Sequence, residues 1–298
     1  MIGTKKRSRH DKVWDTIIGI FMAIFVVVTL YPILNTLAIS FNDGVDSVRG
    51  GIYIWPRVFS LQNYKTVFHN PNLTQAAFIS VSRTVIATVV QVFLTAMLAY
   101  VLSRKRFIFK KQLSIVYVLT MYVNGGMIPT YVLMKDLHLT NNFLVYILPG
   151  LVAAFNMIVL RTYMNGLPDG LVESAKIDGA GDFRIFIQII LPLCKPALAT
   201  IALFIAVGQW NSWFDSMLYC AQSPSLTTLQ YELMKVLSAA TQQGGAGTAD
   251  IAKNSGSIVT SQSIRAAITI VTALPIVFIY PFLQKYFISG LTIGGVKE

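Results

Sequence analysis

The sequence predicts an all-α integral membrane protein with about six transmembrane helices. Only 12% of its 298 residues are charged, about half the share in a typical soluble domain, and 54% are hydrophobic. Because so few charges cannot cover a water-facing surface, lipid must cover much of it. A spanning helix needs roughly 20 apolar residues. Six stretches qualify: 15–40, 75–102, 113–134, 141–163, 191–219 and 265–288.

The basic residues predict the orientation rather than a nucleic-acid partner. The net charge is +11, but its residues stand in short runs between the apolar stretches. With the N-terminus inside, both dense clusters lie in the cytoplasm, as the positive-inside rule requires. The expected organisation is a cytoplasmic tail (1–14), a membrane domain (15–290) and a C-terminal cytoplasmic tail (291–298). The membrane domain has a cytoplasmic loop at 164–190 and extracellular loops at 41–74 and 220–264.

The first stretch, 15–40, is expected to remain in the protein as a membrane helix. Basic residues precede it, as they do in a signal peptide, but it is too long for a signal sequence and no small-residue cleavage site follows. The third stretch is interrupted at Asn124-Gly125-Gly126. Broken helices persist in membranes where they face protein or a water-filled cavity. The break therefore indicates a lumen, with close helix packing through small residues as the alternative.

The outer segments are less informative. Trp55, Tyr53 and Tyr64 in segment 41–74 fit an interfacial aromatic belt or a surface that docks a partner. The stretch from Ala239 to Ser257 is rich in Gly, Ser, Thr, Ala and Gln, which predicts a mobile loop.

One segment, residues 167–192, carries most of the mechanistic information. It reads LPDGLVESAKIDGAGDFRIFIQIILP and will be called the EAA segment. Pro168 can open a first helix, which Gly179 and Gly181 can end. Asp182 can then N-cap a second helix over 183–190. Such a helix–glycine–helix knob suits docking into a groove on another protein. An interfacial helix on the bilayer is the alternative, but four carboxylates disfavour it because lipid headgroups are often anionic.

The EAA segment resembles the EAA motif of permeases of ATP-binding-cassette (ABC) importers. The motif residues are Glu173, Ser174, Ala175, Asp178, Gly179 and Ala180, followed by Leu191 and Pro192. Ser174 departs from the usual alanine but is equally small. Further stretches, at 55–68, 125–131, 208–214 and 280–295, are similar to carbohydrate importer permeases of the MalG-like family, LplC/YtcP type. The resemblance implies a MetI-like, MalG-like permease bundle.

The resemblance also implies partners. These are a second permease subunit, an ABC ATPase dimer that docks on the EAA segment, and an extracellular solute-binding protein. It implies a multi-pass protein of a bacterial plasma membrane that imports a carbohydrate. No GxxxxGK[ST] loop is present, so ATP and Mg²⁺ are expected on the partner ATPase and no cofactor on this chain. No catalytic motif or metal-binding cluster stands out, so we expect neither an enzyme nor a metal site.

Polar residues within the apolar stretches are candidates for the solute path. Membrane-embedded polar groups usually face the interior of a bundle, and amides beside aromatic rings suit a neutral sugar. Hydrogen bonding between helices is the alternative for each residue. The candidates are Asn124, Gln209, Trp210, Asn211 and Asp215.

Two other transport functions remain open at this stage. The first is an ABC permease for a non-sugar solute. The second is an ion-driven secondary transporter, which would show membrane carboxylates and inverted repeats. Asp215 is one such carboxylate, but the sequence has no convincing repeat.

Overall fold

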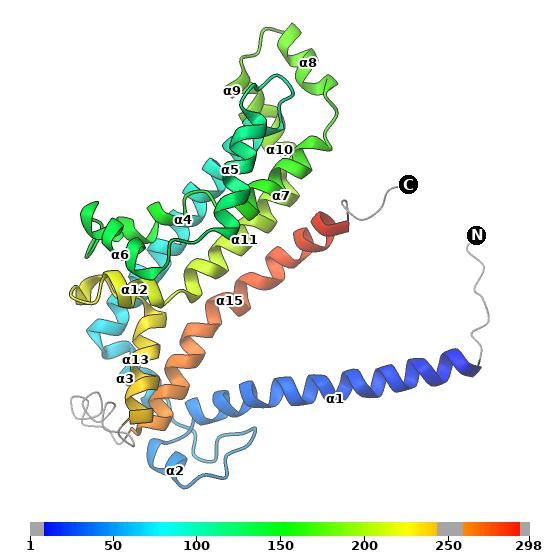
Figure 1. Ribbon diagram of the computed structural model, residues 1–298. Coiled ribbons are helices and arrows are strands. Elements are labelled where there is room, and N and C mark those ends of the chain that lie inside the picture. Colours follow the sequence, from blue (N-terminus) through cyan, green and yellow to red (C-terminus); the bar gives the residue numbers. More distant parts are fainter. Residues whose placement is uncertain (1–8, 243–258, 293–298) are drawn as a thin grey trace. The chain divides into compact units, whose positions relative to one another are not determined.

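The computed structural model describes residues 9–242 and 259–292, which are almost entirely helical (Figure 1). Within those ranges the β-structure is limited to one isolated bridge between Asn42 and Phe59. The chain divides into two compact units. One comprises Met1–Asn70 with Val236–Val271, and the other comprises Pro71–Lys235 with Thr272–Glu298.

Three helices are straight and apolar enough to cross a membrane alone. They are α1 (Arg9–Ser40), α4 (Pro71–Ser103) and α15 (Ser261–Thr292). They confirm the first, second and sixth predicted stretches, although each helix extends a few residues beyond the predicted bounds. Helix α1 buries none of its most apolar window against the residues that the structure describes. Its side chains are therefore available to lipid or to another protein.

The other three predicted stretches are bent pairs of shorter helices. Helix α5 (Lys110–Tyr122) meets α6 (Met127–Asp136) at 118°. The 3₁₀ turns η1 (Phe143–Tyr146) and η2 (Leu148–Gly150) meet α7 (Ala154–Asn165) at 49°. The fifth stretch departs from its predicted bounds, because the run Asp182–Leu193, which begins inside the predicted loop 164–190, meets α11 (Lys195–Asn211) at 83°. The end of the predicted stretch forms a separate short helix, α12 (Phe214–Tyr219). By length and composition the described chain thus has three candidate spans, or six if each bent pair counts as one.

The bend between α5 and α6 confirms the predicted interruption at Asn124-Gly125-Gly126. Gly126 has φ 89° and ψ 169°, a conformation essentially restricted to glycine. Its N–H donates to Asn124 Oδ1 over 2.9 Å, which satisfies a backbone donor that the broken helix leaves free. The sequence therefore places the break where both the conformation and a hydrogen-bond partner are available.

Gly126→Ala is expected to destabilise the chain more than Gly125→Ala does. The side chain at position 126 imposes backbone strain of about 1–3 kcal/mol. Gly125 is the matched control, because its φ is not positive and a Cβ there would meet no atom within 4 Å. Thermal unfolding in detergent measures the difference, and equal melting temperatures would contradict the strain argument.

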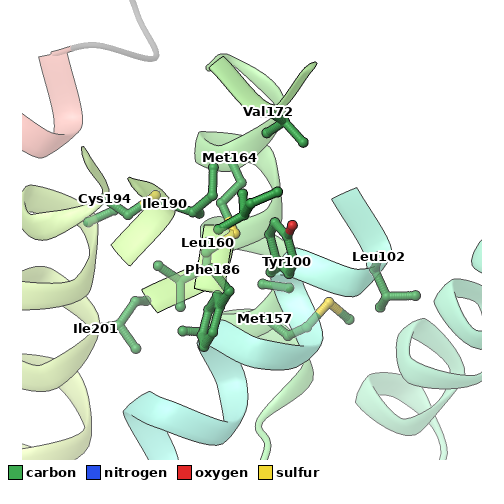
Figure 2. Close-up of a cluster of buried hydrophobic side chains, with 14 of the residues drawn as sticks. Tyr100, Leu102, Met157, Leu160, Met164, Val172, Phe186, Ile190, Cys194 and Ile201 are labelled. Atoms are coloured by element: carbon green, nitrogen blue, oxygen red, sulfur yellow. The ribbon is translucent and has the colours of Figure 1, made fainter. Parts of the chain in front are cut away.

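The second unit is built around α4, α7 and α11, which pack against one another (Figure 1). Their buried side chains form one hydrophobic cluster, shown in Figure 2. Ala96 and Ala99 are small, so they allow α7 to approach α4 closely. Met157 and Leu160 of α7 belong to the same buried cluster. This cluster continues into the EAA segment, so the segment is anchored to the bundle by apolar packing.

In the first unit, the predicted extracellular loop 41–74 is largely ordered by polar contacts. It contains α2 (Gly44–Val48) and α3 (Gln62–His69). Asn63 Nδ2 donates to the carbonyls of Ser40 and Asn42 over 3.0 and 2.8 Å. Asn42 Nδ2 in turn donates to Asp46, and this bond, ahead of the Arg57 guanidinium, lowers the pKa of the Asp46 carboxyl.

The predicted mobile stretch Ala239–Ser257 is only partly described. Its first residues belong to α13 (Leu229–Gln242), so the stretch does not begin as a loop. Residues 243–257 lie outside the described ranges, so the prediction for them remains untested.

Candidate functional site

The EAA segment forms a knob at one end of the second unit. Helix α8 (Gly170–Ile177) and helix α9 (Asp182–Ile185) lie beyond the ends of α4, α7 and α11 (Figure 1). The predicted helix–glycine–helix arrangement is therefore present. The first helix starts at Gly170 rather than at Pro168, a shift within the usual uncertainty of helix ends.

Gly179 ends α8 as predicted, and the hydrogen bonds show how. The N–H of Gly179 donates to the Lys176 carbonyl over 3.1 Å, and the N–H of Ala180 donates to the Ala175 carbonyl over 2.9 Å. These two bonds form a Schellman motif, which needs a left-handed residue after the helix. Gly179 supplies it with φ 79°.

The predicted role of Asp182 is wrong. Gly181 occupies the N-cap of α9, and Asp182 is the first helical residue with no side-chain cap bond. Its carboxylate instead pairs with Lys176 Nζ over 2.9 Å, across the glycine turn. The predicted helix 183–190 is also divided, because α9 gives way to a π-helical turn, η3 (Phe186–Ile190), before α10 (Leu191–Leu193).

Helix α8 has one buried face and one exposed face. Val172 and Ala175 point into the hydrophobic cluster, whereas Glu173, Ser174, Ile177 and Asp178 are exposed. Ile177 is 86% exposed. The exposed face of α8 thus combines one apolar side chain with small and acidic side chains. Of the other motif residues, Ala180 and Leu191 are half-buried, and Gly179 and Pro192 are exposed.

Phe186 links the EAA segment to the bundle. Its side chain is 1% exposed, and its ring centroid lies 5.4 Å from that of Tyr100 and 6.0 Å from that of Phe93 on α4. The widened turn at η3 places Phe186 there, because the Leu191 N–H bonds back five residues to the Phe186 carbonyl. Displacement of the knob would therefore be transmitted to α4 through a packed aromatic contact.

An ion pair ties the knob to the loop that follows α4. Lys105 Nζ lies 2.6 Å from Asp169 Oδ2, and both side chains are largely exposed. The hydrogen bond from Lys105, with its positive charge, lowers the pKa of the Asp169 carboxyl. The same bond raises the pKa of the Lys105 ammonium.

These shifts predict the pH window of the pair. Since the folded-state pKa of Asp169 is depressed, its contribution is present above the unfolded pKa and is lost as pH falls through the folded pKa. For Lys105 the pKa is raised, so the contribution is present below the unfolded pKa and is lost as pH rises through the folded pKa. Lys105→Gln should slightly reduce the fall in melting temperature as the pH is lowered into the acid range (the acid limb of the profile). Added salt should have the same effect, because it screens the pair. An unchanged acid limb would contradict the pairing.

A buried charge network occupies the opposite part of the second unit. Arg83 of α4 is 1% exposed and lies inside the predicted second span. Its Nη1 and Nη2 donate to Asp215 Oδ1 and Oδ2 over 3.1 and 2.5 Å. Its Nε and Nη2 also donate to Gln209 Oε1 over 3.1 and 2.7 Å, and its guanidinium lies 4.3 Å from the Tyr146 ring centroid.

Sequence reasoning missed Arg83, although a signal was present. It is the only charged residue in 75–102, and an ionisable group within a span faces the interior and marks a site by default. Its partners Gln209 and Asp215 were predicted as path residues, and the structure brings these two together on Arg83. Asp215 is thus ion-paired, which differs from the free carboxylate that an ion-driven transporter would use.

The other three path candidates are placed differently. Trp210 is 8% exposed and donates from Nε1 to the Thr272 carbonyl over 2.8 Å. Asn211 and Asn124 are both exposed. Asn211 Nδ2 donates to the Val207 carbonyl, which leaves its Oδ1 without a described partner, and Asn124 uses its Oδ1 on Gly126. Asn211 therefore keeps its amide oxygen, and Asn124 its amide nitrogen, available for a further hydrogen bond.

The decisive comparison covers nearly the whole chain. Residues 1–293 match the family model described as "Binding-protein-dependent transport system inner membrane component". The chain belongs to this family. It is therefore a transport permease and a multi-pass membrane protein, as the sequence resemblance indicated.

Known relatives agree with this assignment. The chain is 36% identical to the polygalacturonan/rhamnogalacturonan transport system permease protein YtcP of Bacillus subtilis, over 96% of this chain and 99% of the relative. It is also 36% identical to protein LplC of the same organism, over 99% of each. A crystal structure of a bacterial ABC transporter involved in the import of the acidic polysaccharide alginate contains a chain that is similar in fold. The TM-score is 0.88 at 28% identity, over 95% of this permease and 100% of that chain.

Proposed function

We propose that this permease is one transmembrane subunit of an ATP-driven importer of oligosaccharides. The full-length similarity to sugar permeases carries the proposal, because relatives that match over 96% and 99% of this chain include one named for polygalacturonan and rhamnogalacturonan transport. A non-sugar solute remains the alternative within the same family. An ion-driven transporter would require a free membrane carboxylate, and the Arg83–Asp215 pair speaks against Asp215 in that role.

The knob is proposed as the contact with the partner ATPase. Its exposed face offers Glu173, Ser174 and Asp178 around the protruding Ile177, and its buried face is anchored by Val172 and Ala175. A lever needs both faces, since force must enter at one and reach the bundle through the other. ATP and Mg²⁺ would bind to the ATPase, and this chain would contribute no cofactor.

The orientation and the remaining partners follow from the same proposal. The knob and the basic cluster around Lys105 would lie in the cytoplasm, together with both termini. A second permease subunit would complete the pathway, and the ordered segment 41–74 would face an extracellular solute-binding protein. The family's own description, as dependent on a binding protein, supports this last partner.

Asn124 and Asn211 are proposed as the residues nearest to the solute. Both are exposed and both keep unused hydrogen-bonding capacity on their amides. Sugar hydroxyls both donate and accept, so an amide matches them on either side. Gln209 and Asp215 are proposed to act indirectly, by fixing the end of α11 through Arg83.

Affinity purification of the tagged permease tests the assembly. We expect a second multi-span permease and a P-loop ATPase to co-purify, with ATPase activity that rises when a loaded solute-binding protein is added. The ligand carried by that binding protein then identifies the solute. A homo-oligomer without ATPase activity would contradict the proposal, and a non-sugar ligand would contradict only the choice of substrate.

A further inference from the structure

A groove of about 690 Å³ runs between α5 and α7, away from the knob's outer face and from the Arg83 network. It is lined at one end by Lys110, Lys111 and Arg161. Toward the other end it is lined by Val118, Leu119 and Ile158. Arg161 Nη1 of α7 donates to Ser114 Oγ of α5 over 2.6 Å. This bond joins the two helices and fixes which residues of α5 lie beside Arg161.

The groove is polar near the membrane boundary and apolar at depth. Lys110 and Lys111 form the first turn of α5, and Leu119 lies nine residues further along it. Nine residues of helix rise roughly 13–14 Å. That distance is close to half of the ~30 Å hydrocarbon core, which is the depth of one leaflet. The gradient therefore matches a molecule with a polar head and an apolar tail that lies in a single leaflet.

In the part of the chain that the structure describes, the charges of the groove have no counterions. Among the residues that the structure describes, none of the ion pairs includes Lys110, Lys111 or Arg161. No carboxylate lines the groove. Three cations at a membrane boundary attract an anionic headgroup, and basic pockets between membrane helices bind such headgroups.

We propose that this groove binds one anionic phospholipid. The phosphate lies among Lys110, Lys111 and Arg161, and an acyl chain lies along Val118, Leu119 and Ile158. Phosphatidylglycerol satisfies this chemistry, whereas phosphatidylcholine places a cation on the same headgroup. The lipid thereby spans the α5–α7 joint directly beside the chain segment that leads into α8.

The test uses the permease with the partners that purify with it, in phosphatidylcholine nanodiscs that contain rising fractions of phosphatidylglycerol. Mass spectrometry of the isolated particles counts retained phosphatidylglycerol per permease. The double variant Lys110→Gln/Lys111→Gln should need a roughly 25-fold higher phosphatidylglycerol fraction for half-saturation, since each cation near the surface contributes about fivefold. The matched control Lys65→Gln/Lys135→Gln removes the same charge at exposed positions outside the groove. It should leave the half-saturation point unchanged.

A second pair of variants tests the apolar end without altering charge. Val118→Trp fills the groove and should reduce retention, whereas Val116→Trp lies on the same helix outside the lining and should not. Equal loss in both charge variants would mean general surface attraction and would overturn the proposal. Equal retention of both lipids by the wild type would also overturn it. A photoreactive residue at position 118 gives a further test, and its cross-linking to another protein chain instead of to lipid would overturn the proposal as well.

Discussion

Asp215→Asn is expected to destabilise the permease by about 3–5 kcal/mol, because it leaves the buried Arg83 guanidinium without a counterion. The Asp215 side chain is 23% exposed, but Arg83 is only 1% exposed, so water has almost no access to the guanidinium that loses its counterion. The pair joins α4 to α12 (Phe214–Tyr219), the short helix that follows α11. Thermal or denaturant unfolding in detergent measures the loss, and a change below about 1 kcal/mol, as for surface pairs, would contradict the burial argument.

A double-mutant cycle separates the pair from general damage. Arg83→Gln/Asp215→Asn removes both charges and should be more stable than Asp215→Asn alone, since no buried charge is left unpaired. Lys176→Gln serves as the control, because its partner Asp182 is 67% exposed on the knob. Breaking that exposed pair should change the melting temperature little. If the double variant is the least stable of all, the ion pair is not what holds these elements together.

Gly179→Pro is expected to abolish coupled uptake while the protein still inserts and folds. Proline fixes φ near −65°, but position 179 has φ 79° and its N–H closes the Schellman motif. The substitution therefore removes the turn that sets α8 against α9, without touching the buried face of either helix. We expect transported solute per ATP hydrolysed to fall at least about tenfold, the effect of about 1.4 kcal/mol on coupling. The ratio is measured in proteoliposomes that contain the full assembly.

Gly170→Ala is the matched control for this experiment. Gly170 is the first residue of the same helix, its φ is not positive, and a Cβ there would meet no atom within 4 Å. Uptake and hydrolysis should both remain at wild-type levels. Unchanged coupling in Gly179→Pro would show that the knob does not act as a lever.

Local patterns in the sequence predicted the elements that depend on local physics. Hydropathy alone located α1, α4 and α15, since a long apolar run has no other stable arrangement in lipid. The glycines at 126 and 179 marked a break and a helix end, because their backbone conformations exclude other residues. The topology of the knob followed from the same chemistry.

Long-range contacts account for what the sequence did not predict. Asp215, one of the partners of Arg83, lies 132 positions away, and no local pattern indicates that α4 meets the chain after α11 there. The role of Asp182 depends in turn on how the glycine turn brings Lys176 within reach of its carboxylate. For the same reason, Gln209 could be recognised as polar and membrane-embedded, but not as a ligand of an arginine.

ATP-dependent uptake tests the central claim most directly. The purified assembly is reconstituted into proteoliposomes with a loaded solute-binding protein outside and ATP, or none, inside. We predict accumulation of labelled oligosaccharide only with ATP, and no accumulation under a proton or sodium gradient alone. Accumulation driven by an ion gradient without ATP would contradict the assignment of this permease to an ATP-driven importer.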